Sequence, residues 1–401
     1  MRQPLKKLRK KCGDIYSLQM GCIPSVVISG YDAVKDGFKI QDLFTDRRYI
    51  NEAWKEHRRF TLSTLKDFGM GKRLMEGKIH EETKNLIEEI RTFEGSCFDP
   101  NELIAVHVSN TMFSLVFKGS FKYTDPRFKE MIKILDENMR SGSGVANFFP
   151  WAARIPGDFL GVHKTFSNAE KIYEFCENII KEHVEFYDEN CIDDLTSAYI
   201  KQIKRCEEND EFLAGLIADL FFAGSETSTT ALRWALVFLV EYPEMQERMF
   251  SKTEAHVGTS RLPSVKDRTV LTYVEAFYTE ILRFCDIAIT GGFHSTPVDV
   301  VFRGYTIPAN TLVIPDLSSV HSDPKIWGDP ETFRPERFLD DSGNIVRRDE
   351  FMAFMIGKRS CVGESLAQME MFLFLSALVQ RFKFENPPGS KLSFAATDCL
   401  G

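Results

Sequence analysis

Cys361 is the residue whose type and setting point most directly to chemistry. It lies between Gly357 and Gly363, follows Arg359, and precedes a segment of helical character, 364–381. Unpaired backbone N–H groups at a helix N-terminus and a neighbouring cation both favour a thiolate over a thiol. The glycines let the backbone turn tightly and approach a flat ligand closely. A thiolate presented in this way suits an axial ligand of haem iron, which favours O–O cleavage; the alternative is a buried cysteine that caps a helix.

A second candidate site lies in the middle of an apolar segment, 211–240. Charges interrupt this segment, so we expect a buried core helix and not a membrane span. Ala223, Gly224, Glu226 and Thr227 lie at its centre. Glycine costs about 1 kcal/mol inside a helix, and polar groups in an apolar helix need partners. An acid beside an alcohol in such a groove is what a proton relay to bound dioxygen needs; a kinked structural helix is the alternative interpretation.

Two further pairs have helical spacing. Trp54 and Arg58 are four residues apart, so they share a helix face, and their N–H donors suit an anionic group at the edge of a planar cofactor. An exposed arginine beside a half-buried tryptophan explains this pair equally well. Glu280 and Arg283 are three residues apart, and an exposed pair of this kind contributes only ~0.3–0.5 kcal/mol.

Periodicity and turn residues indicate the elements that position these groups. The stretch 13–30 reads as two short strands, followed by a helix over 31–40. Further helices are predicted over 80–94, 101–117, 166–187 and 270–284, and further strands over 298–303 and 311–315. The basic start, 1–11, is predicted to be a solvated tail, with binding to an anionic membrane surface as the weaker interpretation.

Composition limits the class of protein. The 401 residues are 43% hydrophobic and 27% charged, which predicts a globular chain, and the 34 Phe indicate a large apolar core. A net charge of -8 argues against nucleic acid as the main partner. The nine cysteines are scattered without zinc-like spacing, which is typical of a reducing compartment. No stretch is typical of a signal peptide or a membrane span.

Several motifs resemble those of the cytochrome P-450 family. Phe354, Gly357, Arg359, Cys361 and Gly363 match the family's cysteine-loop signature at the right spacings. The flanking residues look like the animal microsomal branch that acts on drugs, steroids and fatty acids. Ala-Gly-Ser-Glu-Thr, Glu-x-x-Arg and Phe-x-Pro-Glu-Arg-Phe precede the signature in the family's order. The resemblance covers nearly the whole chain.

The resemblance implies a mainly α fold with small β-sheets, forming a single domain over 1–401. Haem b would lie between the central helix and the cysteine loop, and O2 would be the co-substrate. The implied reaction inserts one oxygen atom into a small lipophilic substrate, such as a xenobiotic, a steroid or a fatty acid. Electrons would come from NADPH indirectly, through a flavoprotein reductase, with cytochrome b5 as a further partner. The implied location is the cytoplasmic face of the endoplasmic reticulum membrane.

By resemblance, Cys361 binds the iron, and Thr227 relays protons with the help of Glu226. Phe354 would shield the sulfur, and Lys358 would help to receive the reductase. The residues that the resemblance assigns to haem binding are Trp54, Arg58, Ala223, Gly224, His294, Phe354, Gly357, Arg359, Cys361 and Gly363, with Trp54, Arg58, His294 and Arg359 at the propionates. The resemblance also implies a buried scaffold of Glu280, Arg283 and Arg337 that seats the haem loop.

The chain departs from the family pattern at three places. It lacks the N-terminal anchor helix, it is short near 48–51 where relatives have a pocket-roof loop, and it ends at 397–401 before a last strand. Two alternatives therefore stay open: a haem-binding protein without turnover, and a helical interaction protein without haem. An enzyme that rearranges peroxides without a reductase is disfavoured, because Glu226 and Thr227 keep the proton-relay pattern.

Overall fold

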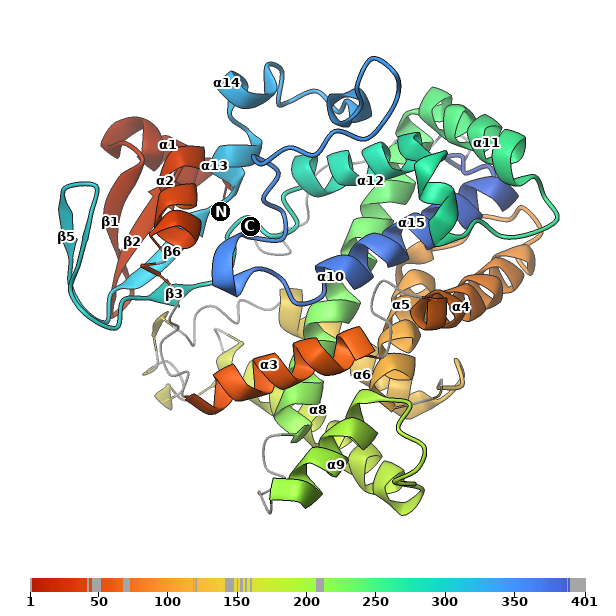
Figure 1. Cartoon of the computed structure of the whole chain (residues 1–401), viewed down its shortest axis with the longest axis horizontal. Coiled ribbons are helices and arrows are strands. Elements are labelled where there is room, and N and C mark those ends of the chain that lie inside the picture. Colours follow the sequence, from red (N-terminus) through yellow and green to blue (C-terminus); the bar gives the residue numbers. More distant parts are fainter. Residues whose placement is uncertain are drawn as a thin grey trace.

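The computed structural model is mainly helical with two small β-sheets, as the sequence predicts (Figure 1). It describes residues 2–41, 43–44, 52–67, 73–117, 119, 121–140, 148–149, 151, 154–155, 157–158, 161–206, 213–387 and 389. The loop near 48–51 and the end 397–401, where the sequence departs from the family pattern, lie outside these residues.

In the first half of the chain, one helix precedes the hairpin β1–β2 and the other helices follow it. Its described helices are α1 Arg2–Cys12, α2 Tyr31–Lys35, α3 Glu52–Asp67, α4 Arg73–Arg91, α5 Pro100–Phe117, α6 Pro126–Arg140, α8 Val162–Glu185 and α9 Leu195–Cys206. The π-helix η1, Asp36–Ile40, continues α2. The single helix expected over 31–40 is therefore a short α-helix that continues directly as a π-helix. Gly37 in the π-helix allows the ring of Phe44 to pack closely, because a Cβ there would lie 2.7 Å from that ring.

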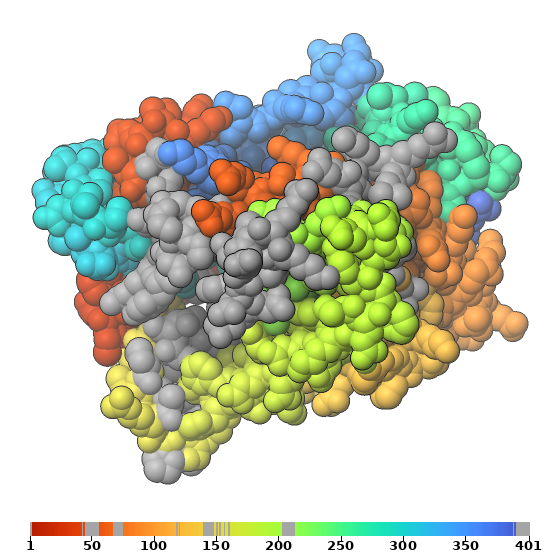
Figure 2. Space-filling model, turned by 60° about the horizontal axis from the view of Figure 1, so that its bottom comes forward, coloured from red at the N-terminus to blue at the C-terminus, as the bar shows by residue number. Residues whose placement is uncertain are grey.

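The second half holds the central helix and the cysteine loop. Its described helices are α10 Leu213–Glu241, α11 Pro243–Val257, α12 Thr272–Phe284, α13 Ser318–His321, α14 Pro324–Trp327 and α15 Glu364–Arg381. Three 3-10 turns join them: η4 Val265–Thr269, η5 Pro335–Phe338 and η6 Gly357–Arg359. The described hairpin β4–β5 and helix α11 lie at opposite ends of the molecule (Figure 1), and Figure 2 shows α9, in yellow-green, on the face turned forward.

The larger sheet joins segments almost 300 residues apart. Its strands are β1 Ile15–Met20, β2 Ile23–Ser29, β3 His294–Ser295 and β6 Leu312–Asp316, in the order β1-β2-β6-β3. β1 and β2 form the predicted antiparallel hairpin, whereas β2 pairs in parallel with β6, from Ser25 opposite Leu312 to Ser29 opposite Asp316. β4 Val300–Phe302 and β5 Tyr305–Ile307 form the second sheet. The parallel pairing brings the N-terminal hairpin to the segment that leads toward the cysteine loop.

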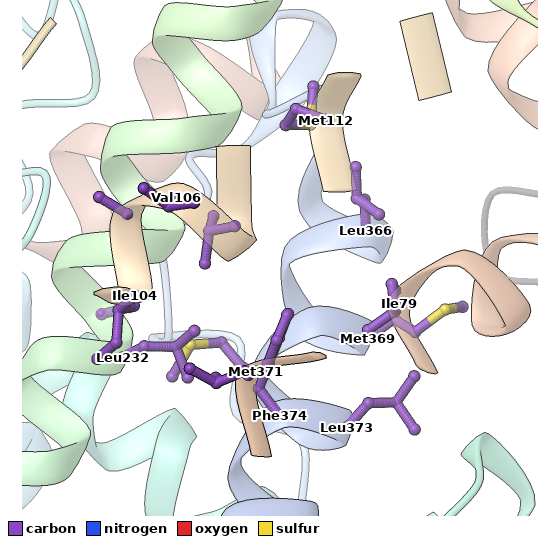
Figure 3. Packing of buried hydrophobic residues seen from close by; sticks show 14 of the residues in the cluster. Ile79, Ile104, Val106, Met112, Leu232, Leu366, Met369, Met371, Leu373 and Phe374 are labelled. Carbon is purple, nitrogen blue, oxygen red and sulfur yellow. The ribbon is translucent and has the colours of Figure 1, made fainter. Parts of the chain in front are cut away.

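Helices α5, α10 and α15 pack together to form the centre of the molecule. α5 is buried from Leu103 to Phe117, including its polar residues His107 and Asn110, and α15 is buried from Met369 to Gln380, so both helices are enclosed on nearly every side. Figure 3 shows Ile104 and Val106 of α5 and Leu232 of α10 near Met371 and Phe374 of α15. This packing holds the central helix against the helix that begins directly after the cysteine loop.

The N-terminal residues contradict the prediction of a solvated tail. They form the helix α1, whose Leu5 is buried and packs in one cluster with Tyr16 of β1. Arg2 lies 3.2 Å from Asp286, and Arg9 lies 2.7 Å from Asp14. The prediction was wrong because the basic composition of 1–11 gives no sign of its tertiary contacts. Leu5 of α1 packs against apolar residues of the sheet, and Arg2 pairs with Asp286, which is distant in the sequence.

Candidate active site

The cysteine loop is a set of tight turns closed by backbone hydrogen bonds. The Cys361 N–H donates to the Phe354 carbonyl at 2.8 Å, and the 3-10 turn η6 lies between them. Gly357 has a φ of 76°, and a Cβ there would lie 2.0 Å from the Phe38 carbonyl oxygen. Only glycine fits this position. Gly357 therefore lets the loop pack against η1, whereas the sequence suggested an approach to a ligand; Gly363 would place a Cβ 3.9 Å from the Cys361 sulfur.

The Cys361 side chain is open to solvent on one side and enclosed by protein on the others. Burial is the largest influence and raises the pKa of its thiol. The backbone N–H groups of Gly363 and Glu364 lower that pKa, as expected of a helix N-terminus, while the Glu364 carboxylate raises it. The sequence named Arg359 as the nearby cation; in the structure Arg58 of α3 acts on the thiol and lowers its pKa. The net direction is opposite to the sequence prediction, because burial outweighs these favourable groups.

One face of α10 is open in the middle of an otherwise buried helix. Asp219, Phe222, Ala223 and Thr227 are exposed and follow one another at helical spacing, whereas most of their neighbours are buried. The Thr227 hydroxyl donates to the Ala223 carbonyl at 2.6 Å, four residues earlier. A threonine that bonds backward in this way bends a helix slightly and leaves its oxygen able to accept a proton. The open face thus carries the alcohol that the sequence singled out.

Gly224 and Glu226 lie away from this open face. A Cβ at Gly224 would lie 2.6 Å from the sulfur of Met112, so the glycine allows α5 to pack closely against α10. Glu226 is buried, with 5% of its surface exposed. The acid and the alcohol that the sequence grouped together therefore differ in their access to solvent.

The sequence interpretation missed Glu370, a carboxyl in the centre of α15. It is fully buried, and the Ser228 hydroxyl of α10 donates to its Oε2 at 2.8 Å. Burial raises the pKa of Glu370 to about 8, and the Ser228 hydrogen bond lowers it by less. The signal was a glutamate within the otherwise apolar stretch 369–375. Ser228 follows Thr227 directly, so Glu370 joins the helix after the cysteine loop to the turn that carries the alcohol.

The remaining predicted cofactor residues lie on several elements. Arg58 is half-buried, and its Nη2 donates to the Ser360 carbonyl at 2.6 Å, next to Cys361. Trp54 lies one turn earlier on α3, but its side chain is outside the described residues. His294 is buried on β3 with its ring 4.8 Å from that of Phe38. Arg359 is partly buried at the end of η6.

The predicted scaffold residues lie together in the core. Arg283 donates from Nε and Nη2 to the two oxygens of Glu280, at 2.6 and 2.7 Å, and Arg337 Nε donates to Glu280 Oε1 at 3.2 Å. All three side chains are buried. Each guanidinium also donates to backbone carbonyls, including that of His321 from Arg283. The Glu280 carboxylate thus accepts hydrogen bonds from two arginine side chains, and this pairing compensates for burying its charge in the core.

The open stripe of α10 and the exposed thiol suit a flat, bulky ligand. A core helix with one exposed face and an exposed cysteine at the start of another core helix are groups that such a ligand could contact. The family model of cytochrome P450 matches residues 36–397. The chain belongs to the cytochrome P450 family. Proteins of this family use haem b and O2, and this chain is accordingly a haem-dependent monooxygenase that receives electrons indirectly through a redox partner.

The relatives are animal members of the family. The chain is similar to cytochrome P450 2J3 of Rattus norvegicus, with 37% identity over 417 residues, covering 97% of this chain and 82% of the relative. It is 35% identical to cytochrome P450 2J2 of Homo sapiens, covering 96% and 81%. It is 37% identical to cytochrome P450 2C5 of Oryctolagus cuniculus, covering 95% and 83%. Among the described helices, none has the length and apolar character needed to cross a membrane.

Proposed function

We propose that this chain is a haem-thiolate monooxygenase in which the Cys361 thiolate would hold the haem iron and the open face of α10 would line the side where oxygen and substrate bind. The observation that carries the proposal is that the Cys361 side chain is exposed among partly buried loop residues, and that the stripe around Thr227 is exposed on a helix with many buried residues. The substrate class is a small lipophilic molecule, such as a xenobiotic, a steroid or a fatty acid. The exposed ring of Phe222 beside Ala223 supports an apolar occupant.

The residues of this chain have distinct roles in the proposal. The bound haem supplies the activation of dioxygen, which a thiolate ligand favours by donating electron density. Cys361 holds the iron, and the N–H of Gly363 and Glu364 together with Arg58 stabilise its thiolate. Phe354 covers the sulfur side, and its carbonyl fixes the Cys361 backbone.

The other roles concern protons and the edge of the haem. Thr227 would relay protons through its hydroxyl, which the Ala223 carbonyl orients, and Glu226, buried next to it in the chain, would help as an acid from behind the open face. Ala223 is small enough to leave the face of the haem accessible. The residues proposed to bind the haem propionates are Trp54, Arg58, His294 and Arg359. Arg58 is already oriented beside the loop by the Ser360 carbonyl.

We further propose that a flavoprotein NADPH reductase is the electron donor, with cytochrome b5 as a second donor. Lys358 is exposed at the cysteine loop and would face an acidic partner. Similarity to microsomal relatives supports a location at the cytoplasmic face of the endoplasmic reticulum membrane. The exposed rings of Phe149 and Trp151 support contact of that segment with a membrane surface.

The experiment that tests the proposal is the carbon monoxide difference spectrum of the reduced protein, recorded for wild type and for Cys361→Ser. A strongly red-shifted Soret band in wild type, absent from the variant, is expected. Haem content without that band in wild type would overturn Cys361 as thiolate ligand. A thiolate band without substrate-dependent NADPH consumption would instead identify a haem-binding protein without turnover, and no Soret absorbance at all would identify a helical interaction protein.

A further inference from the structure

His321 occupies a buried position between the core and the segment that leads into the cysteine loop. It ends α13, and only 1% of its surface is exposed. The backbone N–H of Met352 donates to its Nε2 at 3.1 Å. Because an amide N–H can only donate, Nε2 carries no proton, and the ring is therefore the neutral Nδ1–H tautomer. The contact thus fixes the protonation state of the ring as well as its position.

The His321 ring has two further contacts, an electrostatic one with Asp286 and a stacking one with Phe351. His321 Nδ1 lies 3.5 Å from Asp286 Oδ1, an electrostatic contact that is not aligned as a hydrogen bond. Asp286 is itself buried and lies 3.2 Å from Nε of Arg2 on α1. The His321 ring also stacks on Phe351, with ring centres 6.0 Å apart and planes 23° apart. The carboxylate favours the proton on Nδ1, which leaves Nε2 free to accept from Met352.

Met352 begins a strained turn that connects to Cys361. The Met355 N–H donates to the Met352 carbonyl at 2.9 Å, and Met355 has a φ of 61°. A bulky residue in this left-handed conformation is strained and persists only where its surroundings hold it. Inside this turn lies Phe354, whose carbonyl accepts the Cys361 N–H at 2.8 Å. Consecutive hydrogen bonds therefore join His321 to the backbone of the cysteine.

We propose that His321 is a positioning residue for Cys361: by accepting the Met352 N–H it anchors the strained turn whose Phe354 carbonyl orients the cysteine toward the iron. The inference rests on the proposed role of Cys361 as thiolate ligand. Asp286 favours the Nδ1–H tautomer of His321, and Arg2 supplies the opposite charge beside that carboxylate. The N-terminal helix is thereby connected to the geometry of the metal ligand, although it lies far from it in sequence.

The test compares three substitutions at position 321. His321→Gln carries an amide oxygen at about the place of Nε2 and keeps the acceptor for Met352. His321→Asn is too short to reach Met352 but keeps a polar group near Asp286, and His321→Phe keeps the ring and its stacking on Phe351 without any acceptor. All three are compared with wild type by total haem content and by the fraction of the carbon monoxide complex that shows the thiolate band over time.

The expected result is that the Asn and Phe variants lose the thiolate band about tenfold faster than wild type, as an unmade buried hydrogen bond would cause. The Gln variant is expected to stay within about twofold of wild type. If Phe at this position prevents folding, the pair Asn and Gln gives the same comparison. Equal decay in Gln and Asn, with haem retained, would overturn the role of His321 alone, whereas a wild type without any thiolate band would overturn the role of Cys361.

Discussion

Glu370 makes the stability of this protein depend on pH in a way that can be calculated. Burial raises its pKa from 4.5 to about 8. Between these two values the unfolded chain releases a proton that the folded chain retains, so the free energy of unfolding falls as pH rises. The slope is about 1.36 kcal/mol per pH unit. Over the whole window the ionisation of Glu370 costs up to ~5 kcal/mol, a large part of the stability of an ordinary domain.

Glu370→Gln removes the titrating group and keeps an oxygen that accepts from Ser228. Its amide N–H groups introduce a constant offset, so the informative quantity is how the difference from wild type changes with pH. Between about pH 5.5 and 7.5 the variant should gain ~2.7 kcal/mol relative to wild type. Urea unfolding of the haem-loaded proteins, followed by fluorescence at several pH values, measures this difference.

The matched control removes an exposed carboxyl from the neighbouring helix α4. Glu81→Gln lies at an exposed position, so its stability difference from wild type should stay constant over the same pH range. Ser228→Ala removes the hydrogen bond that lowers the pKa of Glu370, and should therefore keep the wild-type slope and extend it to higher pH. A Glu370→Gln difference that does not change with pH would refute the reasoning, because it would mean that Glu370 is ionised in the folded protein.

The remaining predictions concern the proposed site and its support. Thr227→Ala should lower the product formed per NADPH consumed by about tenfold or more with an unchanged carbon monoxide spectrum, whereas Thr227→Ser should retain coupling; equal coupling in both would remove Thr227 from the proton path. Gly357→Ala should destabilise the loop by about 1–3 kcal/mol, seen as a lower melting temperature and a lower haem content, because its Cβ would meet the Phe38 carbonyl. Glu280→Gln should lower the free energy of unfolding by about 3–5 kcal/mol, since it removes the carboxylate that pairs with the buried Arg283 and leaves Arg337 with Asp329 alone; a loss below ~1 kcal/mol in urea would contradict that interpretation. Lys358→Glu should slow reduction of the haem by the flavoprotein about tenfold at low salt, measured by stopped-flow, and an unchanged rate would argue against Lys358 as a docking residue.

Local patterns were sufficient for much of this protein. The alternation of residues in 13–30 and the helical periodicity of 270–284 predicted β1, β2 and α12 within a few residues of their observed bounds. These signals are local, because the period of the apolar residues reflects which face of an element is buried. The sequence also determined the spacing around Cys361, which identified the candidate ligand and the family before any contact was known.

Only the tertiary structure decided which distant groups meet. Arg58 of α3 lowers the pKa of Cys361, α1 is a docked helix, and Met352 donates to His321. Glu370 looks like a charged residue in the sequence, yet burial against Ser228 makes its neutral form the favoured one. Composition and spacing cannot reveal these outcomes, because burial and hydrogen-bond partners depend on segments that are hundreds of residues apart and are brought together only when the sheet and the helices pack.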